Sequence, residues 1–117
     1  MPRILIADDH PLFRTALAQQ VREVAADVVV DEASSLDGAQ AVLEAHPDTD
    51  LVLLDLHMPG SHGLMGLATL RAEHPTVAVL MVSAHEDPSV VRRALGYGAA
   101  GFLSKSVDAT QIRAALR

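Results

Sequence analysis

Residues that could do phosphate or metal chemistry follow four of the short apolar runs in this chain of 117 residues. They are Asp8-Asp9, Asp55, Ser83 and Ser104-Lys105, after the first, third, fourth and fifth runs. Clustered carboxylates repel one another, and a hard divalent cation with oxygen ligands, above all Mg²⁺, lets them coexist. One carboxylate of such a set could take up a phosphoryl group as an acyl phosphate, while metal, ammonium and hydroxyl neutralise the phosphoryl oxygens.

The apolar runs predict the strands that would bring these side chains together. They are Ile4–Ala7, Val28–Val30, Leu51–Leu54, Val77–Val82 and Gly101–Leu103. Uninterrupted apolar runs of this length are typical of strands buried on both faces, and segments with helical spacing separate them. The expected fold is α/β, a doubly wound parallel sheet of five strands with helices on both faces. Ligands of such a fold bind outside the carboxyl ends of the strands.

Start and stop signals delimit the helices. Pro11 suits a first helical turn, and Ser34 with Asp37 resembles a capping box. Gly96 and Gly98 suit the end of the fourth helix. Asp31-Glu32 follow the second run and are expected at an edge of the sheet. The first helix is expected to bury the stripe Leu12, Ala16, Leu17, Val21 and Val24.

The composition excludes several classes of protein. Fifteen acidic against nine basic residues give a formal charge of −6, so the chain is a poor candidate for clamping nucleic acid or an anionic membrane by itself. The absence of cysteine excludes disulfides and thiolate metal sites. With no membrane-length apolar stretch and no signal peptide, the expected setting is cytoplasmic. Lys105 is the only lysine.

Four motifs give the chain a close resemblance to the receiver domains of bacterial two-component response regulators, most of all the NarL/FixJ (LuxR-type) subfamily. They are Ile6-Ala7-Asp8-Asp9-His10-Pro11, Leu53-Leu54-Asp55-Leu56-His57-Met58-Pro59-Gly60 with Gly63, Met81-Val82-Ser83-Ala84, and Gly98-Ala99-Ala100-Gly101-Phe102-Leu103-Ser104-Lys105. The resemblance implies a flavodoxin-like (βα)5 three-layer sandwich with sheet order 2-1-3-4-5. It also implies that residues 1–117 are one receiver domain, the N-terminal part of a longer regulator with a C-terminal helix-turn-helix domain.

The resemblance assigns roles around the acidic residues. Asp55 matches the aspartate that is phosphorylated. Asp9, Asp55 and the main-chain carbonyl of His57 match the Mg²⁺ ligands, and Asp8 matches an acid that acts on the ion through water. The implied phosphodonor is a sensor histidine kinase or a small phosphodonor, and slow self-dephosphorylation is expected. The implied domain is a switch, not an enzyme with an external substrate; it could homodimerise, and it would reach DNA only through the effector domain.

The resemblance also implies which residues respond to phosphorylation. Ser83 matches the hydroxyl that hydrogen-bonds the phosphoryl group, and Lys105 matches the lysine that pairs with a phosphoryl oxygen. Phe102 matches the aromatic residue that moves inward when the hydroxyl is drawn to the phosphate. Gly60 and Gly63 fit the turn after the site.

Two features depart from the usual receiver pattern or vary within it. Ser106 stands where receivers often have a proline joined by a cis bond, and a cis Lys105–Ser106 bond would cost about 3 kcal/mol. His57 and His85 match the two variable positions that tend to set the rate of dephosphorylation. Two imidazoles there predict a phosphoryl lifetime that depends on pH near neutrality.

The same residues allow other interpretations. Single aspartates at strand ends are often helix caps. His10, His57 and His85 near the mouth suggest a transition-metal site, which the hard oxygen cluster disfavours. A phosphatase of the haloacid dehalogenase type needs a second aspartate two residues after the nucleophile, where His57 stands. A flavodoxin-like cofactor binder needs a phosphate loop after the first strand, where two aspartates would repel phosphate.

Overall fold

Strands and helices alternate along residues 2–58, 64–83 and 88–104, the part of the chain that this computed structural model describes. The strands are β1 (Arg3–Ala7), β2 (Val29–Ala33), β3 (Leu51–Asp55), β4 (Ala78–Ser83) and β5 (Gly101–Ser104). The helices are α1 (Pro11–Val24), α2 (Leu36–Ala45), α3 (Leu64–Glu73) and α4 (Pro88–Gly96). The fifth expected helix lies outside the described residues.

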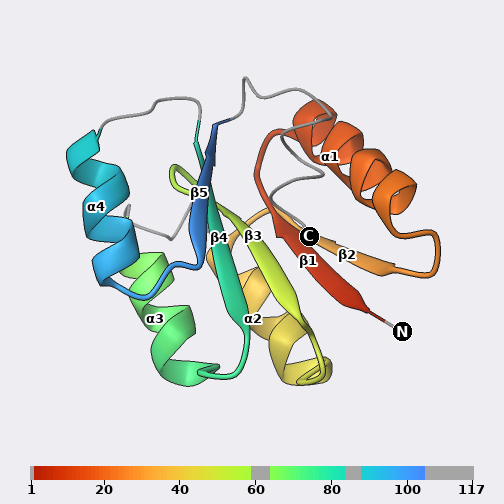
Figure 1. Ribbon diagram of the computed structural model, residues 1–117. Coiled ribbons are helices and arrows are strands. Elements are labelled where there is room, and N and C mark those ends of the chain that lie inside the picture. Colours follow the sequence, from red (N-terminus) through yellow and green to blue (C-terminus); the bar gives the residue numbers. More distant parts are fainter. Residues whose placement is uncertain (1, 59–63, 84–87, 105–117) are drawn as a thin grey trace.

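The strands form one parallel sheet in the order β2-β1-β3-β4-β5, as expected. Helix α1 covers one face of the sheet, and α2, α3 and α4 lie on the other face (Figure 1). A core cluster fills each interface: Leu17, Ala18 and Val21 of α1 pack on one face, and residues of α2, α3 and α4 pack on the opposite face. The predicted doubly wound three-layer fold is confirmed, with four helices described.

The central strands are buried because their residues are apolar on both faces of the sheet. In β1 and β3 the four residues after the first are all buried, and in β4 every residue after Ala78 is buried. Their register runs in parallel toward one edge, where Asp55 ends β3 and Ser83 ends β4. The carboxyl ends of these strands therefore bring the polar residues to the same edge, as predicted.

The second strand differs from its prediction. It runs from Val29 to Ala33, so Asp31 and Glu32 lie inside β2 and do not follow it. An edge strand tolerates such side chains because it is only half covered, and each acid pairs with an arginine. Arg3 lies 2.8 Å from Asp31, and Arg14 lies 3.0 Å from Glu32. The charged end of β2 is thus tied to its neighbours.

Two helix predictions were also wrong in detail. The N-cap of α2 is Ser35, whose Oγ accepts a hydrogen bond from the N–H of Gly38 at 3.1 Å, and not Ser34. Leu12 of the expected α1 stripe is 89% exposed and Ala16 is also exposed, because the helix turns Phe13, Leu17 and Val21 toward the strands instead. None of the described helices is long and apolar enough to cross a membrane.

Candidate functional site

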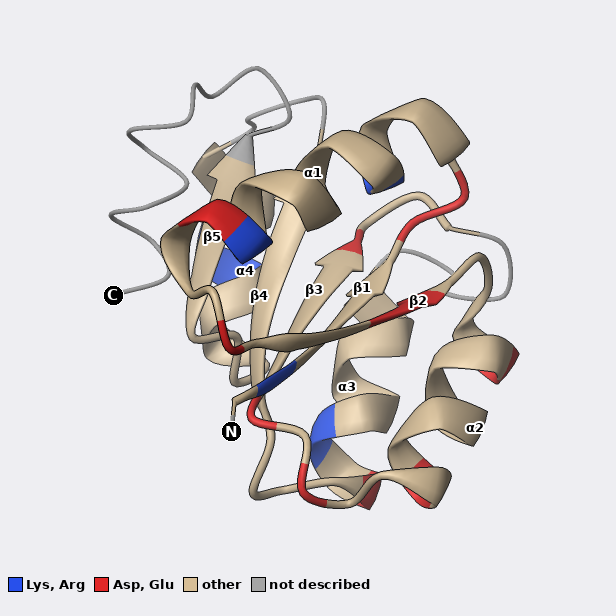
Figure 2. Ribbon diagram, turned by 90° about the vertical axis from the view of Figure 1, so that its right-hand side faces the viewer, with Lys and Arg blue, Asp and Glu red and all other residues tan. Residues whose placement is uncertain are grey.

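The described carboxylates gather at the carboxyl edge of the sheet. Figure 2 shows acidic residues at the ends of β1 and β3. Asp8 and Asp55 are 2% and 1% exposed, so their charges are held almost entirely away from water. One carboxylate oxygen from each of Asp8, Asp9 and Asp55, with one ring nitrogen of His10, all lie within 4.8 Å of one another. This arrangement could hold a metal ion.

Hydrogen bonds to main-chain groups hold the segment after β1 in place. The N–H of Asp8 donates to the carbonyl of Ala33 in β2 at 2.9 Å, and the carbonyl of Asp8 accepts from Nη1 of Arg14 at 2.7 Å. The N–H of His10 donates to Oδ1 of Asp8 at 2.8 Å. The two acids are therefore presented by an ordered turn that ends where α1 begins.

The segment after β3 is held in a similar way. Asp55 is the last residue of the strand, and the N–H of Leu56 donates to the carbonyl of Val82 in β4 at 2.9 Å. The N–H of His57 donates to Oδ1 of Asp55 at 3.3 Å, and the His57 residue is exposed. The structure thus places the main-chain N–H of His57 beside the Asp55 carboxylate, and the roles assigned to its carbonyl and its ring stay predictions.

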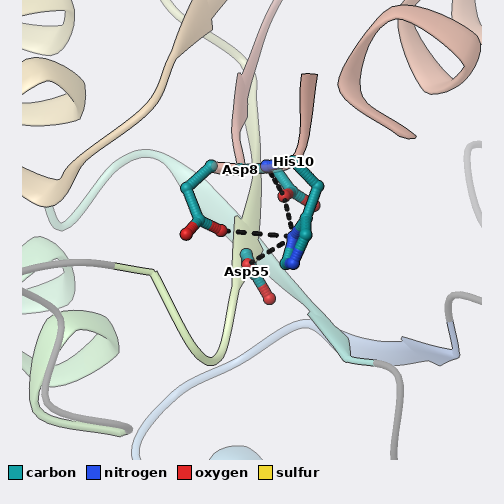
Figure 3. Close-up of side chains that lie close together, drawn as sticks. Asp8, His10 and Asp55 are labelled. Carbon is teal, nitrogen blue, oxygen red and sulfur yellow. Dashed lines mark hydrogen bonds and ion pairs between the residues drawn. The ribbon is translucent and has the colours of Figure 1, made fainter. Parts of the chain in front are cut away.

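His10 enters the site more deeply than the sequence indicated. Its ring Nδ1 lies 2.8 Å from Oδ1 of Asp8, 3.2 Å from Oδ1 of Asp9 and 3.7 Å from Oδ2 of Asp55. The ring points at the carboxylates from the start of α1 (Figure 3). The sequence placed His10 near the mouth and suggested for it only a disfavoured transition-metal site, although its position directly after two aspartates was a signal.

The two residues that the sequence assigns to a switch, Ser83 and Phe102, lie on the neighbouring strands β4 and β5. Ser83 is fully buried at the end of β4, and its Cα is paired with that of Ser104 at the end of β5. Phe102 is partly buried, packs against the core on the α2–α4 face, and is paired with Met81.

The remaining assigned residues fall outside the described ranges. These are Gly60, Gly63, His85, Lys105 and Ser106. The ammonium of the expected phosphoryl site, one of the two rate-setting histidines and the Lys105–Ser106 bond therefore stay predictions from the sequence. Of the three histidines that suggest a transition-metal site, His10 joins the carboxylate cluster, whereas His57 is not part of the group found among the described residues.

The donor set of the site suits a hard cation. Three carboxylates supply oxygen ligands of the kind that Mg²⁺ prefers, and their mutual repulsion is relieved when a divalent ion is bound. The same edge offers a buried carboxylate at Asp55 and a hydroxyl at Ser83. The arrangement could bind a metal and hold an anionic group that is attached to one carboxylate.

The fold and this acidic edge define a signal receiver. The family model of the response regulator receiver domain matches residues 4–117, and the chain belongs to this family. The chain is a receiver domain of two-component response regulators of the NarL/LuxR type. Response regulators of this kind are partners of sensor histidine kinases.

Individual relatives agree with this placement. The chain is 48% identical over 116 residues to the glycerol metabolism activator of Pseudomonas putida, covering 99% of this chain and 52% of that protein. It is 39% identical over 110 residues to the probable transcriptional regulatory protein NarL of Mycobacterium tuberculosis, covering 94% of this chain and 50% of the relative. The solved signal receiver domain of the putative response regulator NarL from that organism superposes with a TM-score of 0.86 at 39% identity, over 98% of this chain and 92% of the other. The chain spans about half the length of the curated relatives it matches.

Proposed function

We propose that this chain is a phosphoacceptor switch in which Asp55 receives a phosphoryl group from a sensor histidine kinase. The observation that carries the proposal is the position of the Asp55 carboxylate, buried at the end of β3 among the carboxylates of Asp8 and Asp9. Family membership supports the same role. A carboxylate so placed is a nucleophile that can form an acyl phosphate.

The transfer is a displacement at phosphorus. An oxygen of the Asp55 carboxylate attacks the phosphoryl group, the bond to the imidazole nitrogen of the donor breaks, and that nitrogen keeps the electron pair. Asp9, Asp55 and the main-chain carbonyl of His57 would hold Mg²⁺, with Asp8 acting through water. Bound Mg²⁺ would neutralise charge on the phosphoryl oxygens. Asp8, Asp9 and His57 therefore orient the acceptor and do not form covalent bonds.

The switch uses the residues at the ends of β4 and β5. The Ser83 hydroxyl would donate to a phosphoryl oxygen and draw the end of β4 inward, and the ammonium of Lys105 would pair with a second oxygen. Because Met81 and Phe102 are paired between the same two strands, the movement would change the packing of Phe102. The altered face of α4 and β5 would then signal to an effector or a second copy.

The whole protein is inferred from its relatives. Their names include an activator and a probable transcriptional regulatory protein, and the chain matches about half of each. We infer that residues 1–117 form the receiver of a longer cytoplasmic regulator. A C-terminal helix-turn-helix domain would bind DNA, and phosphorylation of the receiver would regulate it. The direct output is a change of contacts, and the phosphoryl group is finally lost to water.

The test is intact-protein mass spectrometry after incubation with acetyl phosphate and Mg²⁺. One phosphoryl increment is expected, and it should be absent in Asp55→Asn and in the presence of excess chelator. Asp50→Asn is a matched control, because Asp50 lies at the opposite end of β3, where its carboxylate accepts from the N–H of Arg3. An increment that survives Asp55→Asn, or none in the unaltered chain, contradicts the proposal. Sustained hydrolysis of unrelated phosphate esters would favour a phosphatase.

A further inference from the structure

Arg14, in the first turns of α1, contacts the acidic turn twice. Its main-chain N–H donates to the carbonyl of His10 at 2.9 Å, and its Nη1 donates to the carbonyl of Asp8 at 2.7 Å. The turn from Asp8 to His10 is therefore held by one residue at both of its ends. A guanidinium bond to a main-chain carbonyl is charge-assisted and shorter than an ordinary amide bond.

The orientation of the Asp8 carbonyl affects the positions of both acidic side chains in this turn. It belongs to the peptide unit that joins Asp8 to Asp9, so the side chains of both acids start from the two ends of that one planar group. Rotation of the peptide plane would swing the two carboxylates relative to each other. By fixing the plane, Arg14 sets the relative orientation of two proposed contributors to the metal site.

Glu32 orients the arginine. Its Oε1 accepts from Nε of Arg14 at 3.0 Å, and the neighbouring Ala33 carbonyl accepts from the N–H of Asp8 at 2.9 Å. The end of β2 thus holds both main-chain groups of Asp8. Ala33 binds its N–H directly, and Glu32 holds its carbonyl indirectly, through Arg14. The ion pair is partly solvated, with 21% and 37% of the two side chains exposed, and such pairs add little to stability.

These contacts lead to one inference, which rests on the proposed function. We propose that Arg14 is a positioning residue for Mg²⁺ binding, held by Glu32, and that it acts by fixing the peptide between Asp8 and Asp9. Asp55 comes from β3, and the contacts of Arg14 with Glu32 and with the Asp8 carbonyl do not include it. Loss of these contacts should therefore weaken the affinity for Mg²⁺. The rate of phosphoryl transfer at saturating Mg²⁺ should stay close to that of the unaltered chain.

The chain offers a closely matched control. Asp31, next to Glu32 in the same strand, forms a similar ion pair with Nη1 of Arg3 at 2.8 Å. Arg3 is the first residue of β1, so this pair lies toward the amino ends of the strands, away from the acidic edge. Asp31→Asn and Glu32→Gln each remove one negative charge from an ion pair between β2 and an arginine. Only Glu32→Gln changes a partner of Arg14, the residue that contacts the Asp8 carbonyl.

The experiment measures the Mg²⁺ dissociation constant by calorimetry, together with the rate of phosphorylation by acetyl phosphate as Mg²⁺ is varied. Arg14→Ala is expected to raise the dissociation constant roughly tenfold, the usual effect of losing a partner that orients a metal ligand. Glu32→Gln should raise it by a smaller factor, and Asp31→Asn should leave it unchanged. The maximal rate should stay within about twofold in all of them.

Arg14→Lys provides a second, less disruptive variant. A single ammonium cannot serve Glu32 and the Asp8 carbonyl with the fixed geometry of a guanidinium, so the affinity should fall between those of Arg14→Ala and the unaltered chain. Amide signals of Asp9 and His10 in nuclear magnetic resonance spectra should move in both Arg14 variants without Mg²⁺, and not in Asp31→Asn. These signals report the turn independently of activity.

The outcomes separate this inference from the proposed function. An unaltered chain that binds Mg²⁺ and is phosphorylated, with Arg14 variants of equal Mg²⁺ affinity, overturns the inference alone. Equal losses of affinity in Glu32→Gln and Asp31→Asn would make the effect one of general strand stability and also overturn it. An unaltered chain with no Mg²⁺ binding and no phosphorylation overturns both.

Discussion

The ring Nδ1 of His10 lies 3.7 Å from Oδ2 of Asp55, although His10 follows β1 and Asp55 ends β3. The same nitrogen lies 2.8 Å from Oδ1 of Asp8 and 3.2 Å from Oδ1 of Asp9. Bound Mg²⁺ would need oxygens at about 2.1 Å. The imidazole therefore contacts the carboxylate oxygens that Mg²⁺ would bind, and the ring and the ion would compete for them.

This geometry predicts that His10→Ala binds Mg²⁺ more tightly. The ring gives up contacts to the carboxylates when the ion takes them, and its removal abolishes that competition. We expect a dissociation constant roughly three- to tenfold lower, which is the equivalent of one net hydrogen bond. Titration calorimetry at constant pH and ionic strength measures the change.

His46→Ala is the control for this prediction, because His46 caps the carboxyl end of α2, before β3 and away from the acidic edge. It should leave Mg²⁺ affinity unchanged. Weaker binding in His10→Ala would mean that the imidazole is itself a ligand of the ion, and the competition would then be the wrong account.

Most of the acidic edge could be anticipated from the sequence for a simple reason. Carboxyl ends of parallel strands meet at one edge, so a polar residue that ends an apolar run must lie there. Asp8, Asp55 and Ser83 all follow this rule. Their approach in space is a consequence of topology and needs no knowledge of side-chain conformation.

The contacts of His10 and Arg14 could not be anticipated in that way. Whether the His10 ring turns toward the carboxylates depends on its rotamer, and the run pattern carries no information about rotamers. Arg14 meets Glu32 only because β2 extends to Ala33, three residues beyond the apolar run. The strand continues through two charged residues because pairing with β1 and two arginines offset their polarity.

The N-cap of α2 provides a test of local structure. Ser35→Ala should lower the free energy of unfolding by about 1 kcal/mol, because the N–H of Gly38 loses its acceptor at the helix start. Urea denaturation followed by circular dichroism measures the difference. Ser34→Ala, at the exposed neighbouring position that the sequence favoured, should change stability by less than about 0.5 kcal/mol. Equal losses in both variants would contradict the assignment of Ser35 as the cap.

The connection between α4 and β5 depends on a glycine with a positive φ. Gly98 has φ +98°, and a Cβ there would lie 3.1 Å from Nε of Arg71. Gly98→Ala should therefore cost roughly 1–2 kcal/mol of stability. Gly96→Ala is the matched substitution, since a Cβ at this last residue of α4 meets nothing within 4 Å. It should stabilise by a few tenths to about 1 kcal/mol. Thermal unfolding that ranks the two variants in the opposite order would contradict the account.

Substitution of Ser83 should distinguish phosphorylation of Asp55 from the structural change that follows it. Under the proposed function the nucleophile is Asp55, so Ser83→Ala should still gain one phosphoryl increment from acetyl phosphate. The hydroxyl is what would draw the end of β4 toward the phosphoryl group, and Met81 and Phe102 are paired across β4 and β5 two residues before that end. Phosphorylation should therefore shift the amide signals of Met81 and Phe102 in the unaltered chain, and these shifts should be largely lost in Ser83→Ala. Ser83→Thr keeps the hydroxyl and should retain them. If Ser83→Ala shows the full shifts, the signal reaches β5 by a route that does not use this side chain.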